Sequence, residues 1–200
     1  MPPKAHQKKD EEPTQPLDVT TLPTPALTST PLRMSYRIAR GEQGVLTFEP
    51  YKSLLLPHWR FKTIPIATHS SQNLKRAFDH YVAAGDLVGA DMARKFIQMG
   101  MTRAKRYANH KGGRKYDRSE REIEKEGGER SELPKSEGHE GREEKLGASE
   151  VFKGVWRSCM GDERYLELKR EFLVEQRAWD KAQKAKVTKE EVKSEDDSNS

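Results

Sequence analysis

Residues 85–109 read GDLVGADMARKFIQMGMTRAKRYAN, and the predicted fold is centred on this stretch. Its apolar residues recur three and four positions apart, which is the spacing of one helix face. That face consists of Met92, Phe96, Met99, Gly100, Ala104 and Tyr107. Polar residues form a contiguous arc on the other face: Asp91, Arg94, Lys95, Gln98, Thr102, Lys105, Arg106 and Asn109. The pattern predicts a helix from the N-cap Asp86 to about Asn109, with one face on a core and the polar arc toward solvent.

A second helical pattern precedes this one, over residues 66–84. Its apolar stripe is Leu74, Ala77, Phe78 and Tyr81. Its start is open, because either Ser70 or Ser71 can cap a helix and so can Thr63, which stands shortly before Pro65. Only Gly85 and Asp86 separate the two patterns, so we expect an antiparallel helical hairpin. A strip of small residues permits close approach of a neighbour: Gly89, Ala93, Gly100 and Ala104.

Two further helices are expected toward the C-terminus. Residues 149–159 form the first, and Asp162 caps the second, which extends to about Lys184. The second has an apolar stripe of Tyr165, Leu168, Phe172 and Trp179. This spacing is typical of packing on a core and equally of a short coiled-coil face for a protein partner.

The part before the hairpin has turn signals instead of a helical period. Arg40–Gly44 is expected to form a tight turn, and Val45–Phe48 is a short strand candidate ended by Pro50. The fold class predicted for the chain is therefore mainly α: a small single-domain helical core, made of a helical hairpin plus C-terminal helices. A short extended and β-turn part precedes the hairpin.

Composition divides the chain into folded and disordered parts. Residues 1–32 are rich in Pro and Thr and are expected to be a disordered arm. Residues 33–116 together with 149–186 are expected to form one folded basic domain. Residues 117–148, which are rich in Glu, Gly and Ser, are predicted to be a disordered acidic insert, and residues 187–200 a disordered tail.

The basic charge of the chain lies in one block. The whole chain carries a formal charge of +5, but residues 30–118 contain 17 basic and 6 acidic residues, a difference of +11. Residues 119–148 contain 6 basic and 10 acidic residues, a difference of −4. This asymmetry indicates an anionic partner such as a nucleic acid.

The remaining bulk features predict a soluble intracellular protein, cytoplasmic or nuclear. One cysteine, Cys159, allows no disulfide within the chain, and no apolar run is long enough for a membrane span. Residues 1–10 lack the apolar region of a signal peptide. The basic pairs Lys105-Arg106 and Arg114-Lys115 also have the form of a split nuclear-import signal.

Two long blocks resemble an uncharacterised domain family of bacteria and fungi. The first is RGEQGVLTFEPYKSLLLPHWRFKT, residues 40–63, and the second is GDLVGADMARKFIQMGMTRAKRYANHKGGRKY, residues 85–116. Weaker similarity resumes over residues 151–179. The resemblance implies that residues 33–116 and 150–180 fold as one unit. It implies no activity, because the family has none assigned.

The candidate binding site is the basic part of the polar arc and the segment after it. Its residues are Arg94, Lys95, Lys105, Arg106, His110, Lys111, Arg114 and Lys115. Such a cluster binds phosphates by releasing counterions, and Tyr107 and Tyr116 lie between the cations, where they can stack on bases. The function predicted is binding of RNA, DNA or another polyanion. The alternative is an ordinary solvated helix face.

Arg103 stands apart, because it falls among the apolar residues of its helix. A charge there needs a partner, and Glu42 or Glu49 is expected to pair with it. The sharper alternative is an enzyme or small-molecule cleft that holds an anionic ligand, with Glu42, Glu49, Tyr51, His58 and Arg103 as the residues to test. The histidines lack metal-ligand spacing, so neither a metal nor a cofactor is expected.

Overall fold

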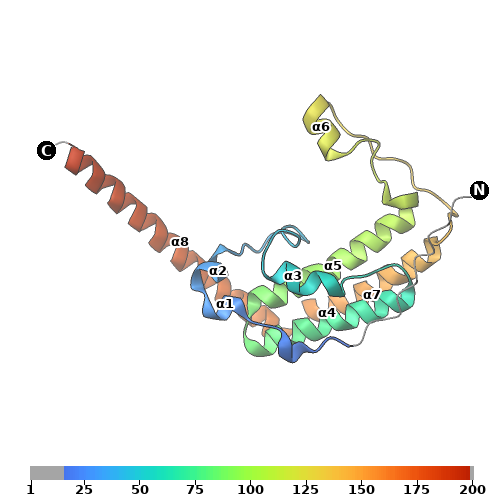
Figure 1. Cartoon of the computed structure of the whole chain (residues 1–200), viewed down its shortest axis with the longest axis horizontal. Helices are drawn as coiled ribbons and strands as arrows, with labels where there is room; N and C mark the ends of the chain where they lie inside the picture. The colour runs from blue at the N-terminus through green and yellow to red at the C-terminus, as the bar shows by residue number, and fades with distance from the viewer. Residues whose placement is uncertain (1–15, 199–200) are drawn as a thin grey trace, which may run out of the picture.

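The computed structural model describes residues 16–198, with side chains described for residues 16–186. Within these residues every regular element is an α-helix or a short 3-10 helix (Figure 1). The predicted mainly helical fold is therefore confirmed. Within residues 16–198, no helix is both long enough and apolar enough to cross a membrane.

Three helices form the core of the fold. They are α4 (Ile64–Ala84), α5 (Leu87–Asn109) and α7 (Arg142–Met160), and each packs against the other two. Helix α8 (Glu163–Ser198) packs on this bundle with its first turns and then extends away from it (Figure 1). The short elements are η1 (Val19–Thr21), α1 (Pro25–Thr28), α2 (Thr30–Ser35), α3 (Tyr51–Leu55), η2 (Leu56–His58), η3 (Lys111–Gly113) and α6 (Glu120–Glu126).

The hairpin of α4 and α5 forms as predicted, and its caps are those expected from the sequence. Of the three possible caps of α4, Thr63 is correct, with Pro65 in the first turn. Gly85 ends α4 in the left-handed conformation, with φ of 79°. The carboxylate of Asp86 then accepts a hydrogen bond from the backbone N–H of Gly89 at 3.0 Å, which caps α5.

Two glycines of the small-residue strip allow neighbouring helices to approach α5. A methyl group at Gly89 would overlap the ring of Tyr81 in α4. A methyl group at Gly100 would overlap the ring of Phe152 in α7. Phe96, between them in the sequence, is fully buried. The strip is therefore a packing feature that lets aromatic rings lie directly on the backbone of α5.

The apolar stripe of α8 packs on the core. Tyr165, Leu168 and Phe172 are buried, and Trp179 is partly buried against the same cluster. This supports core packing for the first turns of the helix. The helix also runs past the expected end at Lys184 to Ser198. A protein partner for its outer part stays a prediction.

Residues 16–32 are ordered, contrary to the prediction of a disordered arm, whose residues 1–15 lie outside the described part. Pro25 and Pro31 occupy the first turns of α1 and α2, where a missing N–H costs nothing. Ala26 is fully buried, and its backbone N–H donates to the hydroxyl of Tyr51 at 3.0 Å. Two of the prolines that suggested disorder, Pro25 and Pro31, therefore stand at helix starts in a segment that packs on the bundle.

The strand predicted at Val45–Phe48 is wrong. Residues 41–47 form consecutive turns, with Val45 N–H donating to the carbonyl of Glu42 and Thr47 N–H to that of Gly44. Val45 is nevertheless buried. Leu46 is exposed, and the hydrogen bonds with α5 are made by Gly41, Glu42 and Gln43.

The insert, residues 117–148, is shorter and more structured than predicted. Helix α7 begins at Arg142, seven residues before the expected Ser149, and Lys145 in its first turns donates to the carbonyls of Phe61 and Lys62. Residues 114–136, which begin just before the insert and include most of it, form a flap that carries α6. An antiparallel bridge between Tyr116 and Glu132 closes its base. Figure 1 shows α6 projecting beyond the end of α5.

Candidate anion-binding site

The polar arc of α5 divides into a buried and an open half. Arg94 and Lys95 were predicted to bind anions, but both are buried, Lys95 completely. Residues 36–45 and the start of α8 cover this half of the helix, as the contacts of Gly41, Gln43 and Tyr165 with it show. Arg94 and Lys95 are therefore structural residues, and the prediction for them is wrong.

Asp91 is the centre of the buried half. Its carboxylate accepts hydrogen bonds from the hydroxyls of Tyr36 at 2.5 Å and Tyr165 at 2.7 Å. It also accepts one from Nε of Arg94 at 2.7 Å, and Nζ of Lys95 lies 3.7 Å away. One buried carboxylate thus links α5 to the residue after α2 and to α8.

Ionisation in this network follows from the contacts. Burial on its own raises the pKa of Asp91, but the Arg94 guanidinium and the hydroxyl donors outweigh it, so the pKa lies below its ordinary value. Burial lowers the pKa of Lys95, and the nearby Asp91 only partly offsets this. Lys95 is further held by the carbonyl of Gln43 at 3.0 Å and by the ring of Tyr36.

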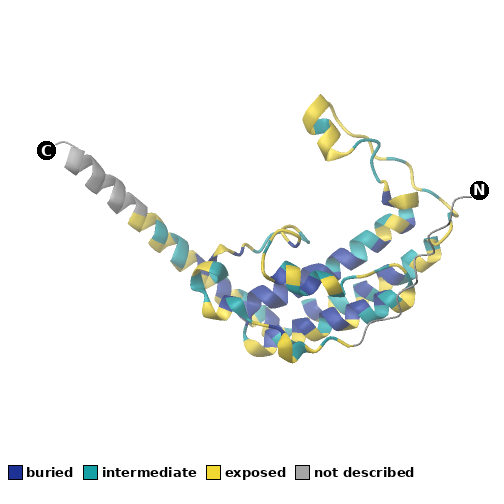
Figure 2. Cartoon of the chain, viewed as in Figure 1, coloured by how far each residue is buried: buried dark blue, intermediate teal, exposed yellow. Residues whose placement is uncertain are grey.

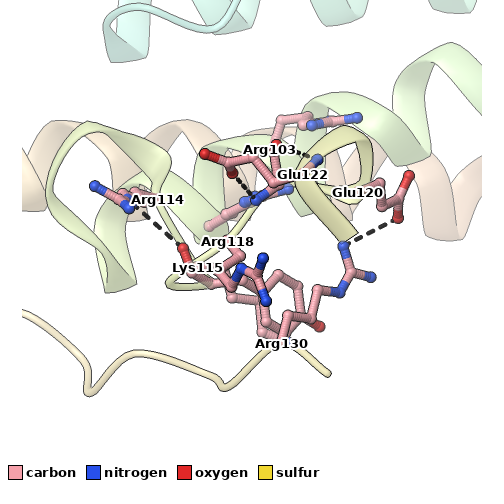
Figure 3. Close-up of a pocket in the computed structure, with 10 residues that line it drawn as sticks. Arg103, Arg114, Lys115, Arg118, Glu120, Glu122 and Arg130 are labelled. Carbon is pink, nitrogen blue, oxygen red and sulfur yellow. Dashed lines mark hydrogen bonds and ion pairs between the residues drawn. The ribbon is translucent and has the colours of Figure 1, made fainter. Parts of the chain in front are cut away.

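The open half of the arc leads into a pocket between the end of α5 and the flap (Figure 3). The pocket has a volume of about 700 Å³. Arg103 and Arg106 contribute from α5. The other lining residues come from the flap: Arg114, Lys115, Tyr116, Arg118, Ser119, Glu120, Glu122 and Arg130. Six cationic and two anionic side chains therefore line it, a difference of +4.

The cations of the pocket fall into two groups. Three form ion pairs with carboxylates: Lys115 with Glu132 at 3.2 Å, Arg118 with Glu126 at 2.6 Å, and Arg130 with Glu120 at 3.1 Å, the last visible in Figure 3. The other three are Arg103, Arg106 and Arg114. No carboxylate within the described side chains pairs with any of these three. We call them the free arginines.

Two of the free arginines are positioned by backbone carbonyls. Nε of Arg106 donates to the carbonyl of Gly113 at 2.7 Å. Arg114 donates to the carbonyl of Asp117 at 2.6 Å and weakly to that of Tyr116 at 3.4 Å. Carbonyl contacts orient a guanidinium without neutralising its charge. Carbonyls of η3 and of the flap thus fix positive charge at the pocket wall.

Arg103 does not have the ion pair predicted for it. The carboxylate of Glu42 accepts from the hydroxyl of Thr102 at 2.6 Å. Glu49 pairs with Lys52 and accepts from the backbone N–H of Ser53. Both acids are engaged elsewhere because the turns of residues 41–47 and the start of α3 hold them there. Arg103 is left to line the pocket.

The other predicted binding residues are dispersed. Lys105 and Lys111 are exposed but do not line the pocket. His110 is buried. Of the eight predicted residues, the structure brings together Arg106, Arg114 and Lys115.

The residues predicted for a small-molecule cleft also lie apart. Tyr51 is fully buried, and its hydroxyl donates to the carboxylate of Asp86 at 2.5 Å. His58 is the last residue of η2 and is half-buried, and its pKa is lowered by burial and then by the charges of Arg60 and His69. Tyr51 thus lies at the start of α5, whose cap is Asp86, whereas Arg103 lies near its end. These residues do not form one cleft.

Arg118 and Arg130 were missed because they fall in the segment predicted to be disordered. A signal was available. Ser119 and Glu122 have the spacing of a capping box, and both of its hydrogen bonds are present at the start of α6. That signal predicts a helix start directly after Arg118, which places this arginine near the ordered end of α5.

The described side chains contain no cluster of three or more His, Cys, Asp or Glu that would hold a metal ion. Cys159 is buried, and burial raises the pKa of its thiol to about 12. A thiol in that state is a poor nucleophile. The chemistry that the pocket itself offers is recognition of negative charge by guanidinium groups.

Comparison with known proteins gives a family but no activity. No curated protein and no solved structure matches the chain. A family match covers residues 21–175, which include the bundle, the flap and the pocket. The chain belongs to the family described as Domain of unknown function (DUF4385).

Proposed function

We propose that the protein binds phosphate groups of a polyanion in the pocket at the end of α5. The observation that carries the proposal is the presence of three free arginines in one pocket. Guanidinium groups form bidentate, charge-assisted hydrogen bonds with phosphates. Glu122 lies in the same pocket, where a hydrogen bond from the backbone N–H of Ser119 lowers its pKa and the nearby charges of Arg118 and Arg114 lower it further. The lining still carries a charge difference of +4 that a bound phosphate would reduce.

Repulsion between the cations of the pocket favours the state with a bound anion over the empty pocket. Like charges about 4 Å apart repel each other by about 1 kcal/mol in water and by more where the protein lowers the dielectric. Arg103 and Arg106 are one turn apart on the same helix, Arg106 contacts Gly113 in η3, and Arg114 contacts Asp117 in the flap. A phosphate bound in the pocket would offset part of this excess of positive charge.

A phosphorylated small molecule is the second candidate. The volume of about 700 Å³ lies within the range of small-molecule sites. The lining is mostly charged, however, whereas small-molecule pockets are mainly apolar. A charged, open pocket fits one segment of a longer anionic chain better than a whole enclosed ligand.

The test measures the salt dependence of binding. Fluorescence anisotropy with labelled single-stranded oligonucleotides gives the affinity at several salt concentrations. Each phosphate contact contributes about −0.7 to the log–log slope, so replacing Arg103, Arg106 and Arg114 by Gln should flatten the slope by about 2.

The matched control replaces Arg170, Arg177 and Lys181 by Gln. These residues are exposed on α8 and lie outside the pocket. Both triple variants lower the net charge of the chain by three, so only a specific site distinguishes them. If the wild type shows no salt-sensitive binding at low ionic strength, polyanion binding is refuted, and the phosphorylated small molecule becomes the first candidate.

A further inference from the structure

Tyr107 is an exposed aromatic residue beside the free arginines. It lies one turn after Arg103 on α5 and keeps 38% of its surface exposed. Its ring rests against Gly113, where a side chain on the glycine would overlap it. The carbonyl of the same Gly113 accepts the hydrogen bond from Arg106. Gly113 therefore fixes the ring and one free arginine next to each other.

The ring of Tyr107 is supported from behind by other aromatic residues. Phe61 contacts it edge-on, with centroids 5.7 Å apart, and Trp59 lies 4.9 Å from Phe61. Nζ of Lys145 lies 5.0 Å from the centroid of Phe61 and is fixed by two backbone carbonyls. A supported ring keeps one orientation without a ligand, so a planar group can stack on it at a small entropic cost.

The spacing of Arg103 and Tyr107 suits one nucleotide. Residues four apart on a helix are neighbours and differ by about 6 Å along its axis. This is of the same order as the reach from a phosphate to the base of the same nucleotide. A phosphate held by Arg103 therefore leaves its base within reach of Tyr107.

We propose that the polyanion is a single-stranded nucleic acid, with phosphates on the free arginines and a base stacked on Tyr107. This inference rests on the proposed function. In a duplex the base faces are covered by neighbouring bases, so a duplex cannot use the ring. Tyr116 is the weaker candidate, because Arg130 lies 4.2 Å and Lys115 5.1 Å from its centroid, whereas Nζ of Lys145 lies 5.9 Å from the centroid of Tyr107.

The test compares three labelled probes on the full chain: an oligothymidylate, an abasic strand of the same length, and the corresponding duplex. The abasic strand keeps the phosphates and lacks the bases. One stacked base contributes about 1–3 kcal/mol, so the ordinary strand should bind about tenfold more tightly than the abasic strand. It should also bind more tightly than the duplex.

Variants of Tyr107 then assign the preference to one side chain. Tyr107→Leu should remove the preference for the ordinary over the abasic strand, and Tyr107→Phe should retain it. The salt slope should be the same in both variants, because no phosphate contact is lost. If Tyr107→Leu does not fold, the wild-type comparison of the ordinary and abasic strands still decides the question.

The possible failures are distinguishable. Salt-sensitive binding of equal strength to all three probes would overturn base stacking and keep the proposed function. Stronger binding to the duplex than to the single strand would do the same. Absence of salt-sensitive binding to every probe would overturn the proposed function itself.

Discussion

Both ends of α5 carry basic residues, and the fold uses them in opposite ways. Near the start of the helix, Asp91 holds Arg94 and Lys95 in a buried network. Near its end, Arg103 and Arg106 face an open pocket with no carboxylate partner among the described side chains. Basic residues on a helix face thus have a structural or a binding role according to what covers them.

The difference arises from chain segments far away in the sequence. Residues 36–45 and the first turns of α8 cover the start of α5 and bring the hydroxyls of Tyr36 and Tyr165 to Asp91. At the other end the flap stands away from the bundle, and Figure 2 shows its mostly exposed surface. If this comparison is correct, substitutions at the start of α5 affect stability and those at its end affect binding.

The largest expected effect is that of Asp91→Ala. It leaves two buried cations without their carboxylate and two buried hydroxyls without an acceptor, and breaking such a network costs about 3–5 kcal/mol of unfolding free energy. Denaturant unfolding followed by circular dichroism measures the loss. Asp79→Ala is the control, because the exposed Asp79–Lys75 pair should contribute less than about 1 kcal/mol. Equal losses for the two variants would show that the buried network is not structural.

Phe96→Ala removes a fully buried ring from the middle of the helix. A loss of about 3–5 kcal/mol is expected from the transfer and cavity terms. The folded fraction of this variant should keep the wild-type salt slope for oligonucleotide binding, because the pocket lies at the end of α5. A loss below about 1 kcal/mol would contradict the assignment of this helix face to the core.

Tyr51→Phe tests the start of α5 with a smaller expected loss of unfolding free energy than the two variants above. The substitution removes the hydroxyl between the cap residue Asp86 and the N–H of Ala26. Leaving these two groups unsatisfied should cost about 1–3 kcal/mol, since the ring itself is retained. The midpoint of thermal unfolding of Tyr51→Phe is compared with that of Phe48→Leu. Phe48 stacks on Tyr51, so this control changes the aromatic packing and keeps the hydroxyl. An unchanged midpoint would mean that water replaces the hydroxyl.

The hairpin was predictable because its signals are local. Thr63 with Pro65, Gly85, Asp86 and the period of Leu74 to Tyr81 all lie within the helices that they define. The burial of Arg94 and Lys95 depends on residues 36–45 and on the start of α8, which are distant in the sequence. The periodicity within α5 carries no information about these segments. Asp91 stands three residues before Arg94 and four before Lys95, and that spacing was the one local sign that both cations pair with Asp91.

The pocket was predictable only in part, for the same reason. Arg106, Arg114 and Lys115 follow each other closely in the sequence, so their proximity was expected. Arg118 and Arg130 join them because the Tyr116–Glu132 bridge folds the flap back on itself. The acidic composition of residues 117–148 predicted disorder and not this placement, because composition does not say which residues of a segment the fold brings together.

The smallest expected effect on stability is that of replacing the three free arginines by Gln. They lie at a surface pocket, and exposed substitutions usually change the unfolding free energy by less than about 0.5 kcal/mol each. Losing the Arg106–Gly113 hydrogen bond costs about 0.5–1.5 kcal/mol. Relief of repulsion between three like charges offsets part of that cost. Salt should therefore stabilise the wild type more than the variant, because added ions screen a repulsion that only the wild type has. Denaturant unfolding at low and high salt measures this difference. A variant that unfolds as readily as Asp91→Ala would show that both ends of α5 are structural, and the contrast between them would be lost.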